Sequence, residues 1–580
     1  MKKLLELSVF AILLTAGCEK QEDPYFLLES GAIHLIVSKE GGYGDYTVLS
    51  NGRWKLIRIP LETWLEAVPS VGNGNGGFQI AIEPNTSGSE RIVGFSITLN
   101  GSKLAQEIVV TQRGGDEKDE DITAIDLGNK REIFVDSYLI NRFTGTSLVL
   151  HHPVDEGPVL FFDKPWEGAH SGYVTIIKEN DIFRVYYRGL SDGWGDGTDA
   201  EVTCFAQSND GVYWEKPNLK IYPHNGSLDN NIILANAAPV MHNFSPFLDS
   251  NPQTLPSQKY KAVGGIHSSG LIAYVSADGI HWMKLREESI LRSKEFAFDS
   301  QNVVFWSESE KCYLCYFRTW SLGGFRTVSR ATSTDFVNWT EPEAMTFGDT
   351  PMEHLYTNQT SPYFRAPHIY IAIGGRFMPD RQVLTDEQAK ELNVDPDYYK
   401  DCSDAFLMSS RGGNVYNRTF MDAFIRPGIG MENWISRSNY PALNVVQTGP
   451  AEMSVYVNQD NAQPTAHLRR YSLRLDGFAS LAASYNGGEA ITKPFTFSGS
   501  ELEINYSTSA AGEIRFEIQD VDEKPIPGFS LEESAMIIGN EISRIVQWES
   551  GKNLTEMRGK PVRLRIVMKD ADLFSFRFKD

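Results

Sequence analysis

SNDGVYW (Ser208–Trp214), SADGIHW (Ser276–Trp282) and STDFVNW (Ser333–Trp339) share one pattern: Ser, any residue, Asp, three further residues and Trp. We name this pattern the turn motif. Asp-Gly between two strands favours a tight turn, in which the Asp carboxylate can accept hydrogen bonds from backbone amides. We expect the Trp to fold back over neighbouring strands. Recurrence at intervals of about 60 residues is typical of one four-stranded sheet per repeat, as in the blades of a β-propeller.

A second recurrence places polar residues directly before an apolar strand. It is seen in AHSGYVTII, HNFSPFLDS, FDSQNVVFW, TNQTSPYFR and GPAEMSVYV, with starts near His170, Asn243, Asp299, Asn358 and Glu452. In a propeller the first strand of each blade lines the central channel. The sequence therefore predicts a five-bladed β-propeller over residues 131–475, with polar side chains converging at one mouth of the channel.

Short alternating runs on both sides of this region predict two further β-domains. Residues 30–115 contain HLIVS, YTVLS, WKLIRI, FQIAIEP, GFSITLN and EIVVTQRGG, with turns spaced as in an immunoglobulin-like sandwich. The acidic run DEKDED then indicates a linker. Residues 476–580 alternate again (ITKPFTF, ELEINYS, EIRFEIQD, PVRLRIVMKD), which predicts a jelly-roll-like sandwich. We expect an all-β fold throughout.

The first residues, MKKLLELSVFAILLTAGC, predict export. Two lysines, a short apolar run and small residues before Cys18 are typical of a secretory signal rather than a membrane span. The ending LTAGC resembles a bacterial lipobox, which implies cleavage before Cys18 and lipidation of its thiol. We expect residues 1–18 to be a lipoprotein signal peptide. The following acidic EKQEDP resembles a tether to the outer membrane, with the cell surface favoured over the periplasmic face; an ordinary signal peptide is the alternative.

Composition excludes several classes of function. With 75 acidic and 54 basic residues the net charge is −21, which disfavours binding to nucleic acid. Cys312 and Cys315 form a CxxC in a strand-like run, where their spacing places the two thiols on opposite faces, and there is no second pair with ligand spacing. We therefore expect neither a metal nor a cofactor. GxSxG, P-loop and HExxH motifs are absent, and GDGTDAE at 195–201 is shorter than a calcium-binding loop.

Two parts of the chain resemble known families. Trp54 in NGRWKLIRIP, the Gly-rich SVGNGNGGFQIAIEPN and the closing IVVTQRGG resemble the BACON domain, which implies a spacer role. The propeller followed by a sandwich that begins GFASLAASYNGGEAITKPF resembles glycoside hydrolase family 32, with kinship to families 43 and 130. The first-blade and second-blade signatures of family 32 are missing, and DKPWEGAHSGY stands at the first position. Fructan chemistry and catalytic residues therefore do not carry over from that family.

Glycoside hydrolysis requires two carboxyl groups that flank the bond, so acids near blade starts are the catalytic candidates. Asp299 directly precedes an inner strand within apolar neighbours, Glu353 lies beside His354, and Glu452 opens the fifth predicted strand. We expect these three to supply the acid, the base and a pKa-setting group. Turn-capping and solvated-loop roles are the structural alternatives.

Further polar and aromatic residues are candidates for binding sugar. They are Glu167, His170, His242, Asn243, Asn358, Gln359, Arg365, Arg376 and Trp434. The sequence thus predicts a cell-surface glycoside hydrolase, exo-acting on oligosaccharides derived from polysaccharides. A non-catalytic glycan-binding lipoprotein and a glycoside phosphorylase are the alternatives. Arginines such as Arg365, Arg376 and Arg381 would suit a carboxylated or sulfated sugar or, in a phosphorylase, phosphate, and ordinary surface arginines are their structural alternative.

Overall fold

The described chain is almost entirely β-strand, which confirms the expected all-β fold. The computed structural model describes residues 26–30, 34–37, 41–59, 63–86, 91–99, 105–112, 124–190, 195, 197–321 and 323–580. The predicted signal peptide and Cys18 lie outside these residues. Contacts divide the chain into two compact units, 1–123 and 124–580. Among described residues α1 (Asp386–Glu391) is the one α-helix, and no helix there is long and apolar enough to span a membrane.

The N-terminal unit is an immunoglobulin-like sandwich of two sheets around one apolar core. Trp54 and Phe78 pack against each other in that core, with ring centroids 5.8 Å apart. The first sheet has the strand order β1 (Phe26–Ser30), β3 (Gly42–Ser50), β7 (Gly76–Ile82) and β5 (Leu65–Val68). The second has the order β2 (His34–Val37), β9 (Ala105–Gln112), β8 (Arg91–Leu99), β4 (Arg53–Ile59) and β6 (Val71–Asn73).

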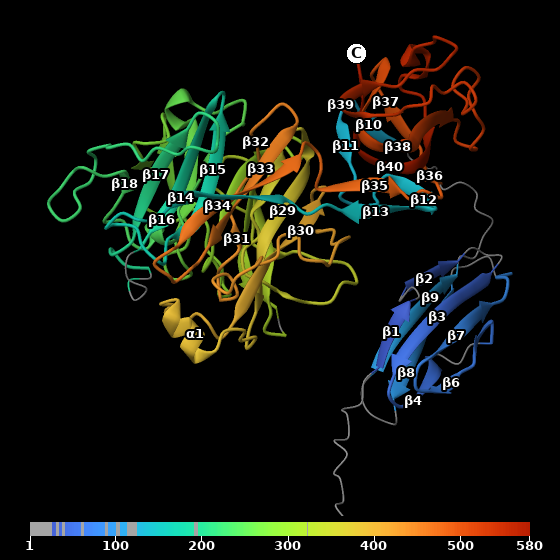
Figure 1. The fold of residues 1–580 in the computed structure, drawn as a ribbon, viewed down its shortest axis with the longest axis horizontal. Helices are drawn as coiled ribbons and strands as arrows, with labels where there is room; N and C mark the ends of the chain where they lie inside the picture. The colour runs from blue at the N-terminus through green and yellow to red at the C-terminus, as the bar shows by residue number, and fades with distance from the viewer. Residues whose placement is uncertain are drawn as a thin grey trace, which may run out of the picture. The chain divides into compact units, whose positions relative to one another are not determined.

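The second unit contains a five-bladed β-propeller, drawn from cyan through green to orange in Figure 1. Blade one consists of β15 (Gly172–Glu179), β16 (Ile182–Gly189), β17 (Val202–Ser208) and β18 (Ile232–Leu234). Blade two consists of β19 (Ser245–Leu248), β20 (Tyr260–Gly264), β21 (Ile272–Ser276) and β22 (Met283–Lys284). Blade three consists of β23 (Val303–Ser307), β24 (Cys312–Trp320), β25 (Arg326–Ser333) and β26 (Glu343–Ala344).

The last two blades are less regular. Blade four consists of β28 (Thr360–Tyr363), β29 (Ala366–Met378), β30 (Cys402–Ser410) and the short β27 (His354–Leu355). Blade five has an inner edge of two short strands, followed outward by three longer ones: β31 (Tyr440–Pro441), β32 (Val446–Gln447), β33 (Glu452–Gln459), β34 (His467–Arg474) and β14 (Val154–Phe161). Because β14 precedes blade one in the chain and pairs with β34, the first strand of the propeller closes its last blade.

The turn motif joins the third and fourth strands of blades one to three. In blade one, Oγ of Ser208 accepts a hydrogen bond from the amide of Gly211 (2.9 Å), and Oδ1 of Asp210 accepts from the amides of Val212 and Tyr213 (2.8 and 2.9 Å). The Asp carboxylates of the other two motifs accept the same pair of amide bonds. The motif therefore forms the predicted hydrogen-bonded turn.

Aromatic residues of each motif also pack against the preceding blade. The ring of Trp214 lies 5.8 Å from that of Tyr456 on β33, and Trp282 packs edge-on against Tyr186 on β16. Phe336 takes the place of Gly in the third motif and contacts Phe247 of blade two. The motif is thus part of the interface between neighbouring blades.

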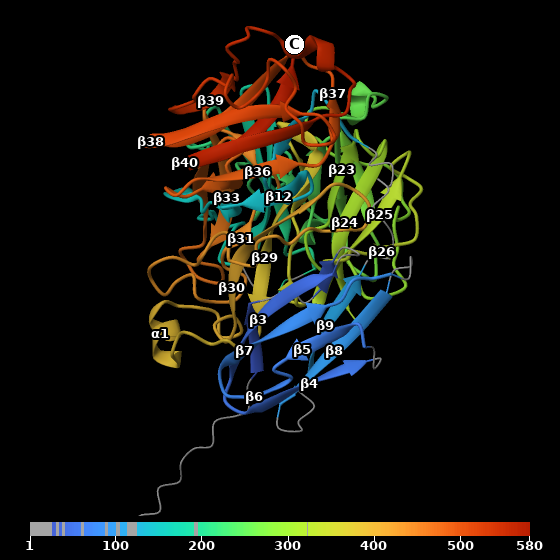
Figure 2. The same ribbon diagram turned by 90° about the vertical axis from the view of Figure 1, so that its right-hand side faces the viewer.

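The C-terminal sandwich is built from both ends of the second unit. Its strands are β10 (Ile125–Gly128), β11 (Arg131–Ile133), β12 (Ile140–Thr144), β13 (Thr146–Leu150), β35 (Ala479–Ala483), β36 (Gly488–Thr492), β37 (Phe495–Phe497), β38 (Glu501–Gln519), β39 (Asn540–Ile545) and β40 (Arg563–Lys579). Figure 2 shows β38 and β40 as long neighbouring strands, and they pair over most of their length. Strands β11, β12 and β13 pair with β40, β36 and β35.

This pairing corrects the expected start of the propeller. We expected residues 131–475 to form it, but strands from 131 to 150 belong to the sandwich sheet, and the propeller begins with β14. A local sequence pattern identifies a strand but not the distant strand with which it pairs.

A buried charge cluster joins the propeller to the sandwich, and we name it the junction cluster. Glu132 on β11 bonds to His368 on β29 (2.8 Å) and to Arg411 after β30 (2.9 Å). Arg411 also donates two hydrogen bonds to Asp136 (2.9 and 3.0 Å). Both acidic residues are 3% exposed.

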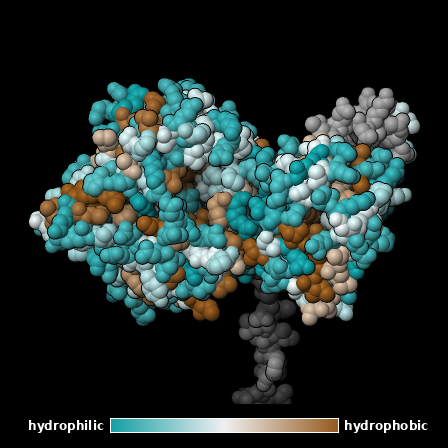
Figure 3. Space-filling model, turned by 90° about the horizontal axis from the view of Figure 1, so that it is seen from above, coloured by the Kyte–Doolittle hydropathy of each residue, from teal (hydrophilic) through white to brown (hydrophobic). Residues whose placement is uncertain are grey.

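The face of the molecule that Figure 3 shows is mostly hydrophilic, with hydrophobic side chains in separate patches.

Candidate functional site

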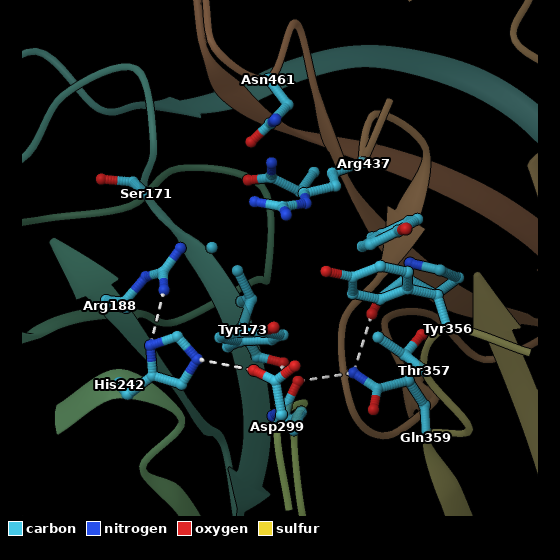
Figure 4. A pocket seen from close by; sticks show the side chains of 16 residues that line it. Ser171, Tyr173, Arg188, His242, Asp299, Tyr356, Thr357, Gln359, Arg437 and Asn461 are labelled. Carbon is cyan, nitrogen blue, oxygen red and sulfur yellow. Dashed lines mark hydrogen bonds and ion pairs between the residues drawn. The ribbon is translucent and has the colours of Figure 1, made fainter. Parts of the chain in front are cut away.

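The inner strands of the five blades begin at one mouth of the channel, and a pocket lies there. Its volume is about 140 Å³, and residues from every blade line it, among them Tyr173, His242, Asp299, Tyr356 and Tyr440. Figure 4 labels Tyr173, His242, Asp299 and Tyr356 around the cavity. The expectation that polar blade starts converge at one mouth is met for blades one to four, since the lining residues lie at the starts of β15, β19, β23 and β28.

Asp299 places a carboxylate in this pocket. It lies four residues before β23, its side chain is 44% exposed, and Oδ2 accepts a hydrogen bond from Nη2 of Arg318 at 2.5 Å. Oδ1 lies 3.8 Å from Nε2 of His242. In Figure 4 Asp299 points into the cavity between His242 and Gln359. Among the described lining residues, Asp299 is the only carboxylic acid.

A second carboxylate lies behind His242. Glu201 is fully buried, and its Oε1 is 2.9 Å from Nδ1 of His242 and 3.2 Å from Nη1 of Arg188. Nδ1 of His242 also lies 3.1 Å from Nη1 of Arg188, which can only donate a hydrogen bond, whereas the Glu201 carboxylate can only accept one. Nδ1 therefore donates to Glu201 when it carries a proton and accepts from Arg188 when it does not. Nε2 of His242 then faces Asp299 and the cavity. This series of contacts, Glu201–His242–Asp299, resembles the acid–imidazole pairs that orient a catalytic histidine.

Arginines and tyrosines form the walls of the pocket. The guanidinium carbon of Arg188 lies 5.0 Å from the ring centroid of Tyr173. Arg437 is the other arginine in the lining, whereas Arg318 lies outside the lining, with its guanidinium carbon 4.4 Å from the ring centroid of Tyr356. The rings of Tyr356 and Tyr440 are 5.0 Å apart. Burial raises the pKa of Tyr173 and of Tyr440, so both stay neutral. Such ring faces offer apolar surface to a ligand beside a few oriented polar groups.

Two glutamines form the floor. Nε2 of Gln359 donates to Oε1 of Gln301 (2.6 Å) and to the carbonyl of Pro441 (2.9 Å). Gln301 donates in turn to Oγ1 of Thr175 (2.9 Å). These bonds link blades one, three, four and five across the axis at the bottom of the pocket, where Gln301, Gln359 and Pro441 are lining residues. The site is therefore a blind pocket at this mouth rather than an open channel.

The structure does not bring the three expected catalytic acids together. Asp299 lines the pocket, whereas Glu353 bonds to Arg376 (3.1 Å) and Arg418 (2.5 Å) outside it. Glu452 begins the second strand of blade five, and its partners are Thr448 and Arg470. Because β33 runs antiparallel to the inner edge of its blade, its start lies at the opposite end of the channel. The expectation that Glu452 opens an inner strand is wrong.

Of the expected binding residues, His242 and Gln359 line the pocket. The others have structural partners elsewhere. Glu167 is buried against Tyr187 and Lys216, His170 faces Asp395, Asn243 bonds to three backbone carbonyls, and Asn358 caps the turn at Thr360. Arg365 pairs with Asp476, Arg376 pairs with Asp404, and Trp434 packs in the cluster beside α1.

Most of the arginines and tyrosines at and around the site were not expected from the sequence. Arg188 is the second-last residue of RVYYRG on β16, and Arg318 stands in CYFRTW on β24. Both lie near the end of the second strand of a blade, which returns to the mouth where the inner strand begins, as the pairing of Gly172 with Arg188 demonstrates. An arginine after two aromatic residues near the end of such a strand is the signal that identifies them.

Within the described residues, no three His, Cys, Asp or Glu side chains are grouped so as to hold a metal ion. Cys312 and Cys315 are free thiols on β24 and pack in different core clusters, on opposite faces of the blade.

Comparisons with known proteins give partial similarities. No protein-family model matches the chain. Two uncharacterized proteins of Mycobacterium tuberculosis (strains CDC 1551 / Oshkosh and ATCC 25618 / H37Rv) are each 46% identical to this chain over 46 residues. The match covers 8% of this chain, and the chain spans only 15% of the length of these relatives.

Solved structures that resemble the chain include a glycoside hydrolase (11% identity, 55% of this chain and 92% of that one, TM-score 0.37). An N-acetylgalactosamine deacetylase from F. plautii in complex with blood group B trisaccharide has 12% identity, 61% and 95% coverage and a TM-score of 0.36. An α-L-arabinofuranosidase from Fusarium graminearum in complex with an iminosugar inhibitor has 10% identity, 55% and 98% coverage and a TM-score of 0.33. These values do not place the chain in a family.

Proposed function

We propose that the protein is a glycoside hydrolase whose active site is the blind pocket of the propeller. The observation that carries this proposal is Asp299, a partly exposed carboxylate beside His242, whose other ring nitrogen is held by the buried Glu201. Glycosidic cleavage requires a group that protonates the leaving oxygen and a group that attacks or activates water. An adjacent carboxylate and imidazole supply one of each, with the imidazole of His242 in place of the second carboxyl group that the sequence led us to expect.

The contacts favour one assignment of roles. Asp299 is the base or nucleophile, because its ion pair with Arg318 suits a carboxylate in its charged form. His242 gives the proton to the leaving oxygen through Nε2, and Glu201 stabilises the imidazolium beforehand through Nδ1. The floor made by Gln301 and Gln359 supports exo action, because a blind pocket admits the end of a sugar chain.

The location proposed for this activity follows from the sequence. We propose lipidation at Cys18, anchoring in the outer membrane and a spacer role for the BACON-like sandwich. An oligosaccharide at the cell surface is then the substrate.

The test measures the release of monosaccharide from plant, algal and host glycans, with and without phosphate. We expect Asp299→Asn and His242→Gln each to lower turnover by about 10²–10⁴-fold. Glu343→Gln is the matched control, because Glu343 is an exposed acid on the outermost strand of the same blade as Asp299. Cleavage that requires phosphate would assign the protein to the phosphorylases, which the arginines of the pocket would suit. Glycan binding without cleavage would contradict the hydrolase proposal.

A further inference from the structure

Three guanidinium groups surround one tyrosine of the pocket. The guanidinium carbons of Arg318, Arg326 and Arg437 lie 4.4, 5.2 and 5.7 Å from the ring centroid of Tyr356. They come from two strands of blade three and from the loop before β31. The arrangement concentrates positive charge at one wall of the pocket, in a chain whose net charge is −21.

Of these three arginines, Arg437 lines the pocket, and among the described residues neither Arg326 nor Arg437 has a carboxylate partner. Arg318 pairs with Asp299. No ion pair between described residues includes Arg326 or Arg437. Nη1 of Arg437 donates to the hydroxyl of Tyr398 (2.7 Å), and Arg326 packs between the rings of Trp320 and Phe377. The buried Nε of Arg326 and Nη1 of Arg318 have no hydrogen-bond partner within the described part of the chain.

Unpaired cations in a partly buried site are costly, because the protein does not replace the water that they lose. Burial lowers the pKa of Arg326, in accordance with this cost. Burial acts in the same direction on Arg437, which lines the pocket, but the neighbouring tyrosines outweigh it there and raise the pKa of Arg437. An anion that enters with the ligand would remove it. Figure 4 shows Arg437 reaching into the cavity from the side opposite Asp299 and His242, so an anionic group and a reacting bond would contact different walls.

We propose that the sugar bound in this pocket carries a carboxylate, as a uronic acid does, and that Arg437 binds this carboxylate while Asp299 and His242 face the glycosidic bond. This inference rests on the proposed function for the part that concerns the bond. A planar guanidinium matches the two oxygens of a carboxylate through paired hydrogen bonds. A sulfate ester on the sugar or free phosphate would share this oxyanion chemistry, and the test separates them.

The test is calorimetric binding to the full-length protein. The ligands are galacturonate, its uncharged methyl ester and galactose, with glucuronate as a second acid. We expect the two acids to bind at least about tenfold more tightly than the methyl ester, and their affinity to fall as salt increases. Two further titrations use inorganic phosphate and galactose 6-sulfate as the ligand in place of the uronate.

Variants of Arg437 locate the contact. Arg437→Gln should abolish the preference for the acid over the ester, and Arg437→Lys should restore part of it, because lysine keeps the charge but loses the paired geometry. Arg286→Gln, an exposed arginine of blade two, is the matched control. Circular dichroism confirms that each variant is folded, and the salt series on the unaltered protein tests the proposal without any variant.

Equal binding of the acid and its ester would overturn the proposal, as would tighter binding of phosphate or the sulfated sugar than of the uronates. Failure of this proposal can be distinguished from failure of the proposed function. If the protein cleaves only neutral glycans, and does so through Asp299, the uronate proposal is refuted and the hydrolase proposal stands. If the protein binds uronates through Arg437 but cleaves no glycan, the proposal for the ligand stands and the hydrolase proposal is refuted.

Discussion

Tyr356 is the residue whose acidity depends most directly on the arginines of the pocket. Burial raises its pKa, but the guanidiniums of Arg437 and Arg318 lower it more, so that the net pKa lies below the usual 10.0. We expect the ultraviolet absorbance of the phenolate to contain a component that rises below pH 10 and that Tyr356→Phe removes.

Binding of a uronate should move this component to higher pH, because the added anion offsets the positive charge of the arginines. Tyr222→Phe is the control, since burial raises the pKa of Tyr222, and its removal should leave the early component unchanged. If Tyr356→Phe titrates as the unaltered protein does, the arginines do not control this phenol.

The two acids Asp299 and Glu452 provide a second test at the scale of the residue. Glu452→Gln should keep full turnover, because its partner Arg470 holds it at the far end of the channel. The side chain of Glu452 is 39% exposed, and the buried Arg470 also donates to Oγ of Ser454, so this guanidinium keeps a partner in the variant. Release of monosaccharide by Glu452→Gln and Asp299→Asn, measured side by side, checks this. A comparable loss in both variants would contradict the position of the site.

At the scale of the element, the glycine of the turn motif determines how closely neighbouring blades pack. Gly279 has φ +77°, and a Cβ there would lie 2.6 Å from the hydroxyl of Tyr186 in the preceding blade. Gly226 has nearly the same φ, +81°, but open space around it. Alanine at either position costs about 1–2 kcal/mol in backbone strain, because its Cβ disfavours the left-handed conformation.

We therefore expect Gly279→Ala to cost about 1–3 kcal/mol more than Gly226→Ala, because Tyr186 is fully buried and its ring cannot move aside. Urea unfolding of the two variants measures the difference. Equal losses would mean that the blade interface adapts to the extra methyl group.

The elements of the propeller were predictable where its sequence repeats and not where it departs from repetition. The turn motif and four of the inner strands follow from local patterns. The inner edge of blade five does not, because it is split into Tyr440–Pro441 and Val446–Gln447, which are too short to show alternation. The longer Glu452–Gln459 has the expected pattern, although it is the second strand. Arg437 and Tyr356 lie in irregular segments, where no period indicates their direction.

At the scale of the whole molecule, the junction cluster joins two layers that the sequence presents as separate domains. Arg411→Met would leave Glu132 and Asp136 buried without their shared cation. We expect a loss of about 3–5 kcal/mol, the usual cost of breaking a buried pair from one side. Arg469→Met is the control, because its pair with Asp155 is partly exposed and should contribute about 0–1 kcal/mol.

Calorimetry of the full chain measures this loss and also tests the coupling. Since the cluster contacts both β11 of the sandwich and β29 of the propeller, the transitions of both should shift together in Arg411→Met. A shift confined to one transition would show that the two parts unfold independently.

The closure of blade five by β14 has a consequence for how the protein is made. Asp155 on β14 and Arg469 on β34 form an ion pair although they are 314 residues apart in the chain. The ribosome therefore delivers β14 long before its partner exists, and the edge of β14 that pairs with β34 must wait unpaired while four blades emerge. Long-range pairing of this kind is slow because loop closure precedes any gain from contacts. Maturation of the ring is thus confined to the period after the last blade has been synthesised.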